Sequence, residues 1–146
     1  MGGVKELTEG KKAPAFSLPD QNGEMLRLSA IDTEYTVLFF YPKDSTPGCT
    51  IEAKGLSDNN SQFKKLGATV VGLSGGDTTS KHKFCSKYNL KVRLVADEDF
   101  AVAKKYGVFG KKSFMGKTFD GIHRTTFVLD RNKKILKVFS KVKPAD

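Results

Sequence analysis

The sequence predicts an α/β fold with a mixed central β-sheet, and three observations support this prediction. Apolar runs rich in β-branched and aromatic residues, at positions 36–41, 68–74 and 92–95, have the composition of buried strands. Segments with helical spacing of apolar residues lie between and after these runs. Near the C-terminal end, two short strand-like segments flank a polar turn, which predicts an antiparallel hairpin. Alternating strands and helices followed by a hairpin are typical of a mixed sheet.

The first two predicted strands flank the longest predicted helix. The strand at residues 36–41 should end at Pro42, and the strand at residues 68–74 should end at two consecutive glycines. Between them, residues 49–66 carry apolar side chains at helical spacing and are followed by Gly67, a typical C-cap residue. Poor helix formers near residues 57–60 predict an interruption of this helix.

The remaining elements follow without a linker, a repeat or a low-complexity tract. We expect a helix at residues 79–88, a strand at 92–95, a short helix at 100–106 and a hairpin formed by 125–129 and 135–139 around the turn 130–133. We therefore expect residues 1–146 to form a single domain.

Composition restricts the class of protein. With 146 residues, of which 38% are hydrophobic, the chain can bury an ordinary core, and two cysteines are too few for a disulfide scaffold. Residues 1–16 contain no apolar segment of signal-peptide length, and no apolar run reaches the roughly 20 residues of a membrane span. We expect an intracellular protein without membrane contact, located in the cytoplasm, with the nucleus as the alternative.

The net charge of +9 lies entirely in the second half of the chain. Residues 1–73 carry 8 basic and 9 acidic side chains, whereas residues 74–146 carry 17 and 7. Such a bias permits weak association with nucleic acid or an acidic partner. The lysines are scattered over several predicted elements, however, and a solvated surface is the favoured interpretation. Examples are Lys87, Lys91, Lys111, Lys117, Lys133 and Lys137.

Residues 41–52 join the first predicted strand to the first predicted helix and contain the candidate reactive residue, Cys49. Cys49 should lie in the first turn of that helix, where unsatisfied backbone N–H groups and the helix dipole favour thiolate over thiol. The carboxyl ends of strands are also where α/β folds place their ligands. The alternative is a buried, unreactive cysteine. Glu52 stands where a Cys-x-x-Cys motif would need its second cysteine, so dithiol exchange of the thioredoxin type is not expected.

The spacing Pro42-x3-Thr46-x2-Cys49 resembles the active-site signature of the peroxiredoxins. Attack of a thiolate on a hydroperoxide places negative charge on the departing oxygen, so the site needs donors aimed at that oxygen. The hydroxyl of Thr46 and the amides of Gly48 and Cys49 can supply them. Thr46 can alternatively serve as a turn or N-cap hydroxyl, and both roles are compatible.

The resemblance extends over nearly the whole chain and is to the bacterioferritin comigratory protein and PrxQ branch of the peroxiredoxins. The matching segments are residues 13–18, 41–44, 46–50, 114–117, 121–124 and 127–130. It implies a thioredoxin-like fold, no metal, no organic cofactor, and a peroxidase that reduces hydrogen peroxide and organic hydroperoxides. It also implies that Arg124 donates to the peroxide oxygens and keeps Cys49 ionised, which suits a planar guanidinium that stays charged. The alternative for Arg124 is a surface salt bridge.

A second thiol must resolve the sulfenic acid that forms on Cys49. Many relatives in this branch carry the resolving cysteine five residues after the first, where this chain has Lys54. A subset of the branch resolves through a cysteine 36 positions on, which is the separation of Cys85 from Cys49. The resemblance therefore implies an intramolecular Cys49–Cys85 disulfide, recycled by thioredoxin or a similar dithiol protein. If Cys85 is instead an inert, packed thiol, an external thiol resolves Cys49 and the enzyme is of the 1-Cys type.

Other interpretations of the sequence remain. One alternative is a basic nucleic-acid-associated protein, but the sequence contains none of the usual recognition motifs. Another is a nucleotide binder that uses residues 73–78, but the sequence has neither a Walker motif nor a dinucleotide motif. A third is a redox sensor, which would use the same cysteine chemistry. A zinc site at His82 and Cys85 would need further ligands. We expect a monomer. Because relatives of this branch continue into another helix, we also expect a C-terminal helix to be missing after Asp146.

Overall fold

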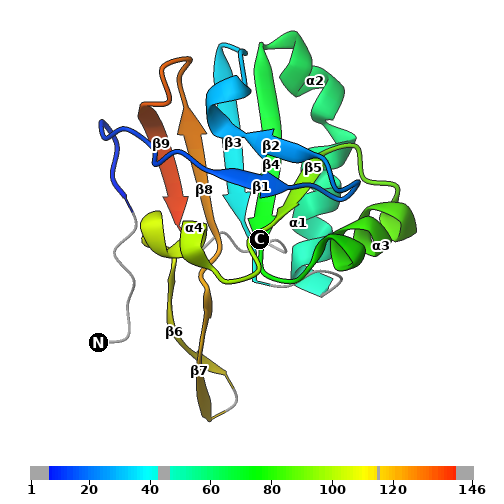
Figure 1. Cartoon of the computed structure of the whole chain (residues 1–146), viewed down its shortest axis with the longest axis vertical. Helices are drawn as coiled ribbons and strands as arrows, with labels where there is room; N and C mark the ends of the chain where they lie inside the picture. Colours follow the sequence, from blue (N-terminus) through cyan, green and yellow to red (C-terminus); the bar gives the residue numbers. More distant parts are fainter. Residues whose placement is uncertain (1–6, 43–46, 115, 141–146) are drawn as a thin grey trace.

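A computed structural model describes residues 7–42, 47–114 and 116–140. Its centre is a five-stranded sheet with the strand order β5-β4-β3-β8-β9 (Figure 1). The central strand β3 (Tyr35–Phe40) pairs in parallel with β4 (Ala68–Ser74) and antiparallel with β8 (Thr125–Leu129). The outer strands are β5 (Arg93–Ala96), parallel to β4, and β9 (Ile135–Ser140), antiparallel to β8. The prediction of an α/β fold with a mixed sheet is confirmed.

The helices lie close to the positions that the sequence predicted. They are α1 (Pro47–Asp58), α2 (Asn60–Lys65), α3 (Thr78–Tyr88) and α4 (Ala101–Lys105), with a short 3-10 helix η1 at Leu28–Ala30. The predicted interruption separates α1 from α2 at Asn59, whose side-chain amide donates to the carbonyl of Gly55 at 2.8 Å. Gly67 ends α2 with a φ of +77°, a backbone conformation in which glycine carries no steric penalty.

The sheet has one apolar cluster on each face, because successive side chains of a strand point in opposite directions. Along β3, Val37 and Phe39 face one cluster, while Leu38 and Phe40 face the other. The first cluster is completed by residues of α1 and α3, including Ala53, Phe84 and Cys85. The second is completed by the N-terminal segment, α4 and the strand residues that face it, among them Phe16, Leu26, Val102, Tyr106 and Phe127. Helices α1 and α3 therefore cover the same face.

Two hairpins were not predicted from the sequence. One consists of β1 (Ser17–Pro19) and β2 (Met25–Arg27) and crosses in front of the sheet in Figure 1. The other consists of β6 (Phe109–Phe114) and β7 (Lys117–Ile122) and extends beyond the sheet as an arm. The strands of the first are too short for a periodic signal. Residues 117–120 of the arm are exposed, so β7 shows little alternation of buried and exposed side chains.

Most of the lysines that the sequence placed on a solvated surface are exposed in the structure. Lys87, Lys91, Lys111, Lys117 and Lys137 are exposed and belong to different elements or loops. Lys133 is half-buried, and its ammonium donates to the carbonyl of Ile31 at 2.7 Å. None of the helices in the described ranges is long and apolar enough to cross a bilayer.

Gly72, in the middle of β4, is a position where a methyl group should be costly. A Cβ atom there would lie 2.5 Å from Cζ of Phe39 and 2.6 Å from Cδ2 of Leu94. Because both neighbours are buried core residues, we expect Gly72→Ala to lower the free energy of unfolding by about 1–3 kcal/mol. Gly55→Ala is the matched control, since a Cβ on this exposed helical residue meets nothing within 4 Å. Urea denaturation of both variants tests the expectation, and equal stabilities would contradict it.

Candidate active site

The carboxyl ends of β3 and β4 form the edge of the sheet from which α1 and α3 begin (Figure 1). The amide of Tyr41, one residue after β3, still donates to the carbonyl of Leu73 at 3.1 Å. Pro42 has no N–H group and ends this ladder, as predicted. The Tyr41 side chain is fully buried and Pro42 is half-buried. The chain therefore leaves the sheet at Pro42 and enters α1 at Pro47.

Cys49 lies in the first turn of α1, as the sequence predicted. Its side chain, the side chain of Glu52 and the whole of Thr46 lie outside the described part of the structure. Further along α1, Ala53 and Ser57 are both buried, at 0% and 3% exposure. Residues 53 and 57 are one helical turn apart and so share one face of α1. The hydroxyl of Thr50 is buried and makes no hydrogen bond to any described residue.

Arg124 comes to the same edge through the pairing of β3 with β8. The last pair of this antiparallel ladder is Phe40 with Thr125, so Tyr41 and Arg124 are the next residues on the two chains. The backbone before Arg124 is held at His123, whose amide donates to the carbonyl of Val108 at 2.8 Å. The His123 ring contacts the carbonyl of Lys111 at 2.9 Å, at the base of the β6–β7 arm. Sheet register therefore brings Arg124 beside the strand end that leads to Cys49.

Cys85 lies in the last turns of α3 and is a reduced thiol in this structure. It is 9% exposed and belongs to the same apolar cluster as Ala53 of α1 and Tyr41. The structure thus places Cys85 on the face of the sheet that α1 covers. Cys85 does not lie in the first turn of α3, which follows β4, but about two turns further along the helix.

Lys81 is a buried charged residue for which the sequence predicted no role. Its side chain is 0% exposed, and its ammonium donates to the hydroxyl of Ser74 and to the carbonyl of Gly75, each at 2.5 Å. The ammonium also lies 5.5 Å from the centre of the Tyr41 ring. The only feature of the sequence that could have indicated its burial is its position one turn before Cys85, on the apolar stripe of α3. A lysine on a helix is ordinarily solvated, so this feature was not enough to predict burial.

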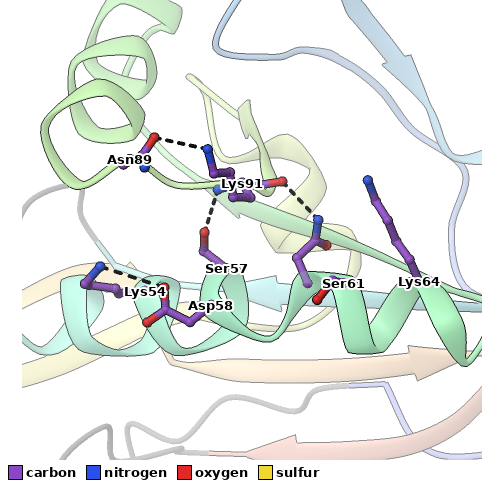
Figure 2. Close-up of a pocket in the computed structure, with 8 residues that line it drawn as sticks. Lys54, Ser57, Asp58, Ser61, Lys64, Asn89 and Lys91 are labelled. Carbon is purple, nitrogen blue, oxygen red and sulfur yellow. Dashed lines mark hydrogen bonds and ion pairs between the residues drawn. The ribbon is translucent and has the colours of Figure 1, made fainter.

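A polar cavity of about 520 Å³ lies beside the C-terminal part of α1 and is drawn in Figure 2. Lys54, Lys64 and Lys91 are among its lining residues, and Lys54 is paired with Asp58 at 3.8 Å. The amide of Lys91 donates to the hydroxyl of Ser57 and ties the loop after α3 to α1. Lys54 is 53% exposed at this cavity (Figure 2).

The chain matches the family model described as AhpC/TSA over residues 9–138. It is 45% identical to peroxiredoxin Bcp of Escherichia coli over 143 residues, which cover 98% of this chain and 92% of that protein. This chain is a peroxiredoxin of the AhpC/TSA family. The structure of the peroxidoxin BcpB from Mycobacterium tuberculosis superimposes with a TM-score of 0.82 at 36% identity, covering 93% of this chain and 88% of that one. The bacterioferritin comigratory protein of Xanthomonas campestris gives 0.83 at 34% identity, with 89% and 83% covered.

As a peroxiredoxin of the Bcp and PrxQ branch, the protein is a thiol-dependent peroxidase with a thioredoxin fold. A peroxiredoxin takes a hydroperoxide as its substrate and a thiol compound as its reductant. Within the described ranges, no group of three or more His, Cys, Asp or Glu side chains could hold a metal ion, so His82 and Cys85 gain no further ligand there.

Proposed function

We propose that Cys49 is the nucleophile that reduces the hydroperoxide. The Cys49 thiolate attacks the terminal oxygen, the O–O bond breaks, and the departing alkoxide or hydroxide takes a proton to leave as alcohol or water. Cys49 becomes a sulfenic acid. Thr46 and the guanidinium of Arg124 donate hydrogen bonds to the peroxide oxygens, where negative charge develops. Pro42 ends β3 and directs the chain toward this pocket.

One observation supports the proposal: chain order and strand pairing lead three parts of the sequence to, or next to, the carboxyl end of β3. These are the chain at Pro42, the first turn of α1 with Cys49, and the start of β8 with Arg124. A helix N-terminus stabilises a thiolate, and a nearby arginine adds a permanent positive charge. The bacterioferritin comigratory protein of Xanthomonas campestris has alkyl peroxide reduction activity. We propose that this chain reduces both hydrogen peroxide and organic hydroperoxides.

We further propose that Cys85 resolves the sulfenic acid. The Cys85 sulfur attacks the Cys49 sulfur, a disulfide forms, and the hydroxyl leaves with a proton as water. Cys85 lies on the sheet face that α1 covers, in the cluster that contains Ala53. In the Xanthomonas campestris PrxQ, two structures carry single cysteine-to-serine substitutions at positions 36 residues apart, which matches the spacing of Cys49 and Cys85. A dithiol protein of the thioredoxin type then reduces the disulfide and is itself oxidised.

The burial of Cys85 favours a second candidate. A thiol that is 9% exposed must leave its apolar cluster before it can react, and a disulfide requires the two Cα atoms to lie within about 7 Å. If α3 does not open, an external thiol resolves Cys49 and the protein is a 1-Cys peroxidase. The two candidates share the first chemical step and differ only in the second.

The variant Cys85→Ser separates them. We expect this variant to consume the first equivalent of peroxide at the wild-type rate, because Cys49 is intact. Steady-state turnover with thioredoxin should then fall by at least about tenfold, since the sulfenic acid has no internal partner. Stopped-flow peroxide consumption measures the first step, and thioredoxin oxidation measures turnover. Unchanged turnover would favour the 1-Cys candidate and leave the role of Cys49 intact.

A further inference from the structure

We propose that Lys81 is a positioning residue for the resolving step: its buried ammonium holds α3 closed in the reduced enzyme and is released when Cys85 joins Cys49. This inference rests on the proposed Cys49–Cys85 disulfide. It assigns a role to a buried charged side chain that the chemistry at Cys49 does not use.

The contacts of Lys81 tie α3 to the carboxyl edge of the sheet. Its ammonium donates to Ser74, the last residue of β4, and to the carbonyl of Gly75. It also lies over the ring of Tyr41, the residue that follows β3. A buried ammonium is stable only with such partners, because desolvation penalises an unpaired charge. The folded position of α3 therefore depends on these contacts.

The position of Lys81 places it between Cys85 and the edge that Cys85 must approach. Helix α3 starts after β4 at the carboxyl edge, extends sideways from it in Figure 1, and packs against β5. Lys81 and Cys85 are four residues apart, so Cys85 lies about 6 Å further from that edge along the helix axis. In a regular helix the amide of Cys85 also bonds to the carbonyl of Lys81. If Cys85 moves to the first turn of α1, the turn that carries Lys81 has to open.

Opening of this turn changes the surroundings of the ammonium. In the closed helix Lys81 is fully buried, whereas Lys83 and Lys87 on the same helix are exposed. In the disulfide form we expect Lys81 to reach water, where it needs no protein acceptor. Its contacts then stabilise only the reduced form. They oppose disulfide formation and favour reduction of the disulfide, so Lys81 affects how readily the oxidised enzyme is recycled.

Acylation of lysines in the wild-type protein tests the inference directly. An amine-reactive acetylating reagent is applied to the reduced protein and to protein in which peptide mapping has shown the Cys49–Cys85 linkage. We expect the acetylation rate of Lys81 to rise at least about tenfold on oxidation, as for a site released by local opening. Lys83 and Lys87 are internal controls and should change little. A Lys81 that stays protected in the linked protein would overturn the inference.

A double-mutant cycle in the reduction potential gives a second test. Ser74→Ala removes one acceptor from the buried ammonium and should destabilise the reduced form alone. We expect an approximately tenfold shift of the equilibrium toward the disulfide, or a potential about 30 mV more negative for this two-electron couple. In the Lys81→Met background the same substitution should have no such effect. Equal shifts in both backgrounds, or no shift in either, would overturn the inference.

The experiments distinguish a failure of the proposed function from a failure of the inference about Lys81. If wild-type protein treated with peroxide forms no Cys49–Cys85 linkage, the resolving role of Cys85 is wrong, and the role of Lys81 is wrong with it. If the linkage forms while Lys81 stays protected, only the inference about Lys81 is wrong.

Discussion

Cys49→Ser should lose peroxidase activity by more than about a thousandfold, because a serine hydroxyl is not ionised near neutral pH and cannot replace a thiolate as nucleophile. The loss should appear in the first turnover, before any reductant is needed. Stopped-flow measurement of peroxide consumption with excess enzyme isolates that step. The reduced variant should otherwise keep the wild-type fold and stability, since this substitution exchanges one small side chain for another.

Cys85→Ser is the matched control for this experiment. Both variants lose one of the two cysteines of the chain, yet only Cys49→Ser should lose the first oxidation. If Cys49→Ser consumes peroxide at the wild-type rate, the assignment of Cys49 as the nucleophile is wrong. If Cys85→Ser loses the first step instead, the roles of the two cysteines are reversed.

Arg124→Met should slow the reaction with peroxide by about a hundredfold, which corresponds to the loss of one charge-assisted donor to the transition state. The methionine keeps much of the aliphatic length but offers no hydrogen bond and no charge. Arg124→Lys should retain part of the rate, because the charge remains while the planar pair of donors is lost. Alkylation of Cys49 by iodoacetamide should slow as well, since that rate reports the thiolate fraction.

Arg131→Met is the control for the substitution at Arg124. Arg131 lies in the turn between β8 and β9, is 57% exposed, and pairs with Asp32 at 2.8 Å. Exposed ion pairs of this kind contribute about 0–1 kcal/mol, so both activity and stability should change little. A loss of peroxide reactivity that is equal in the two arginine variants would contradict a specific role for Arg124.

The sequence predicted the central elements well because their local patterns are strong. Residues 68–74 form a continuous apolar run, and the structure has β4 at Ala68–Ser74, the same bounds. The strand predicted at residues 36–41 was also correctly expected to stop before Pro42, because a proline has no N–H group to donate to the neighbouring strand. The interruption between α1 and α2 was also visible in the sequence, because Gly55 and the polar residues after it are poor helix formers.

The features that were missed depend on contacts between distant segments. The β1–β2 hairpin is held against β5 by the ion pair of Asp20 with Arg93 at 2.9 Å, which no local pattern reveals. The burial of Lys81 depends on Ser74, Gly75 and Tyr41, which only the assembled sheet brings together. A lysine four residues before a cysteine looks like an ordinary surface residue until the strand ends around it are known.

In the candidate site, too, some features follow from local sequence and others depend on contacts between distant segments. The first-turn position of Cys49 follows from local sequence, because a buried strand, a turn and a helix follow one another there. The place of Arg124, by contrast, required the resemblance to known peroxiredoxins. The structure supplies the physical reason, since the pairing of Phe40 with Thr125 carries Arg124 to the end of β3. Sheet register of this kind cannot be obtained from the composition of either strand alone.

The most direct test of the whole account is a peptide map of the wild-type protein after treatment with one equivalent of hydrogen peroxide, without reductant. We expect an intact mass lower by two hydrogen atoms and a single cross-linked peptide pair that contains Cys49 and Cys85. Adding thioredoxin should restore both thiols. A map in which Cys49 carries a sulfenic acid, or lies in a disulfide that lacks Cys85, while Cys85 remains a thiol would contradict the account.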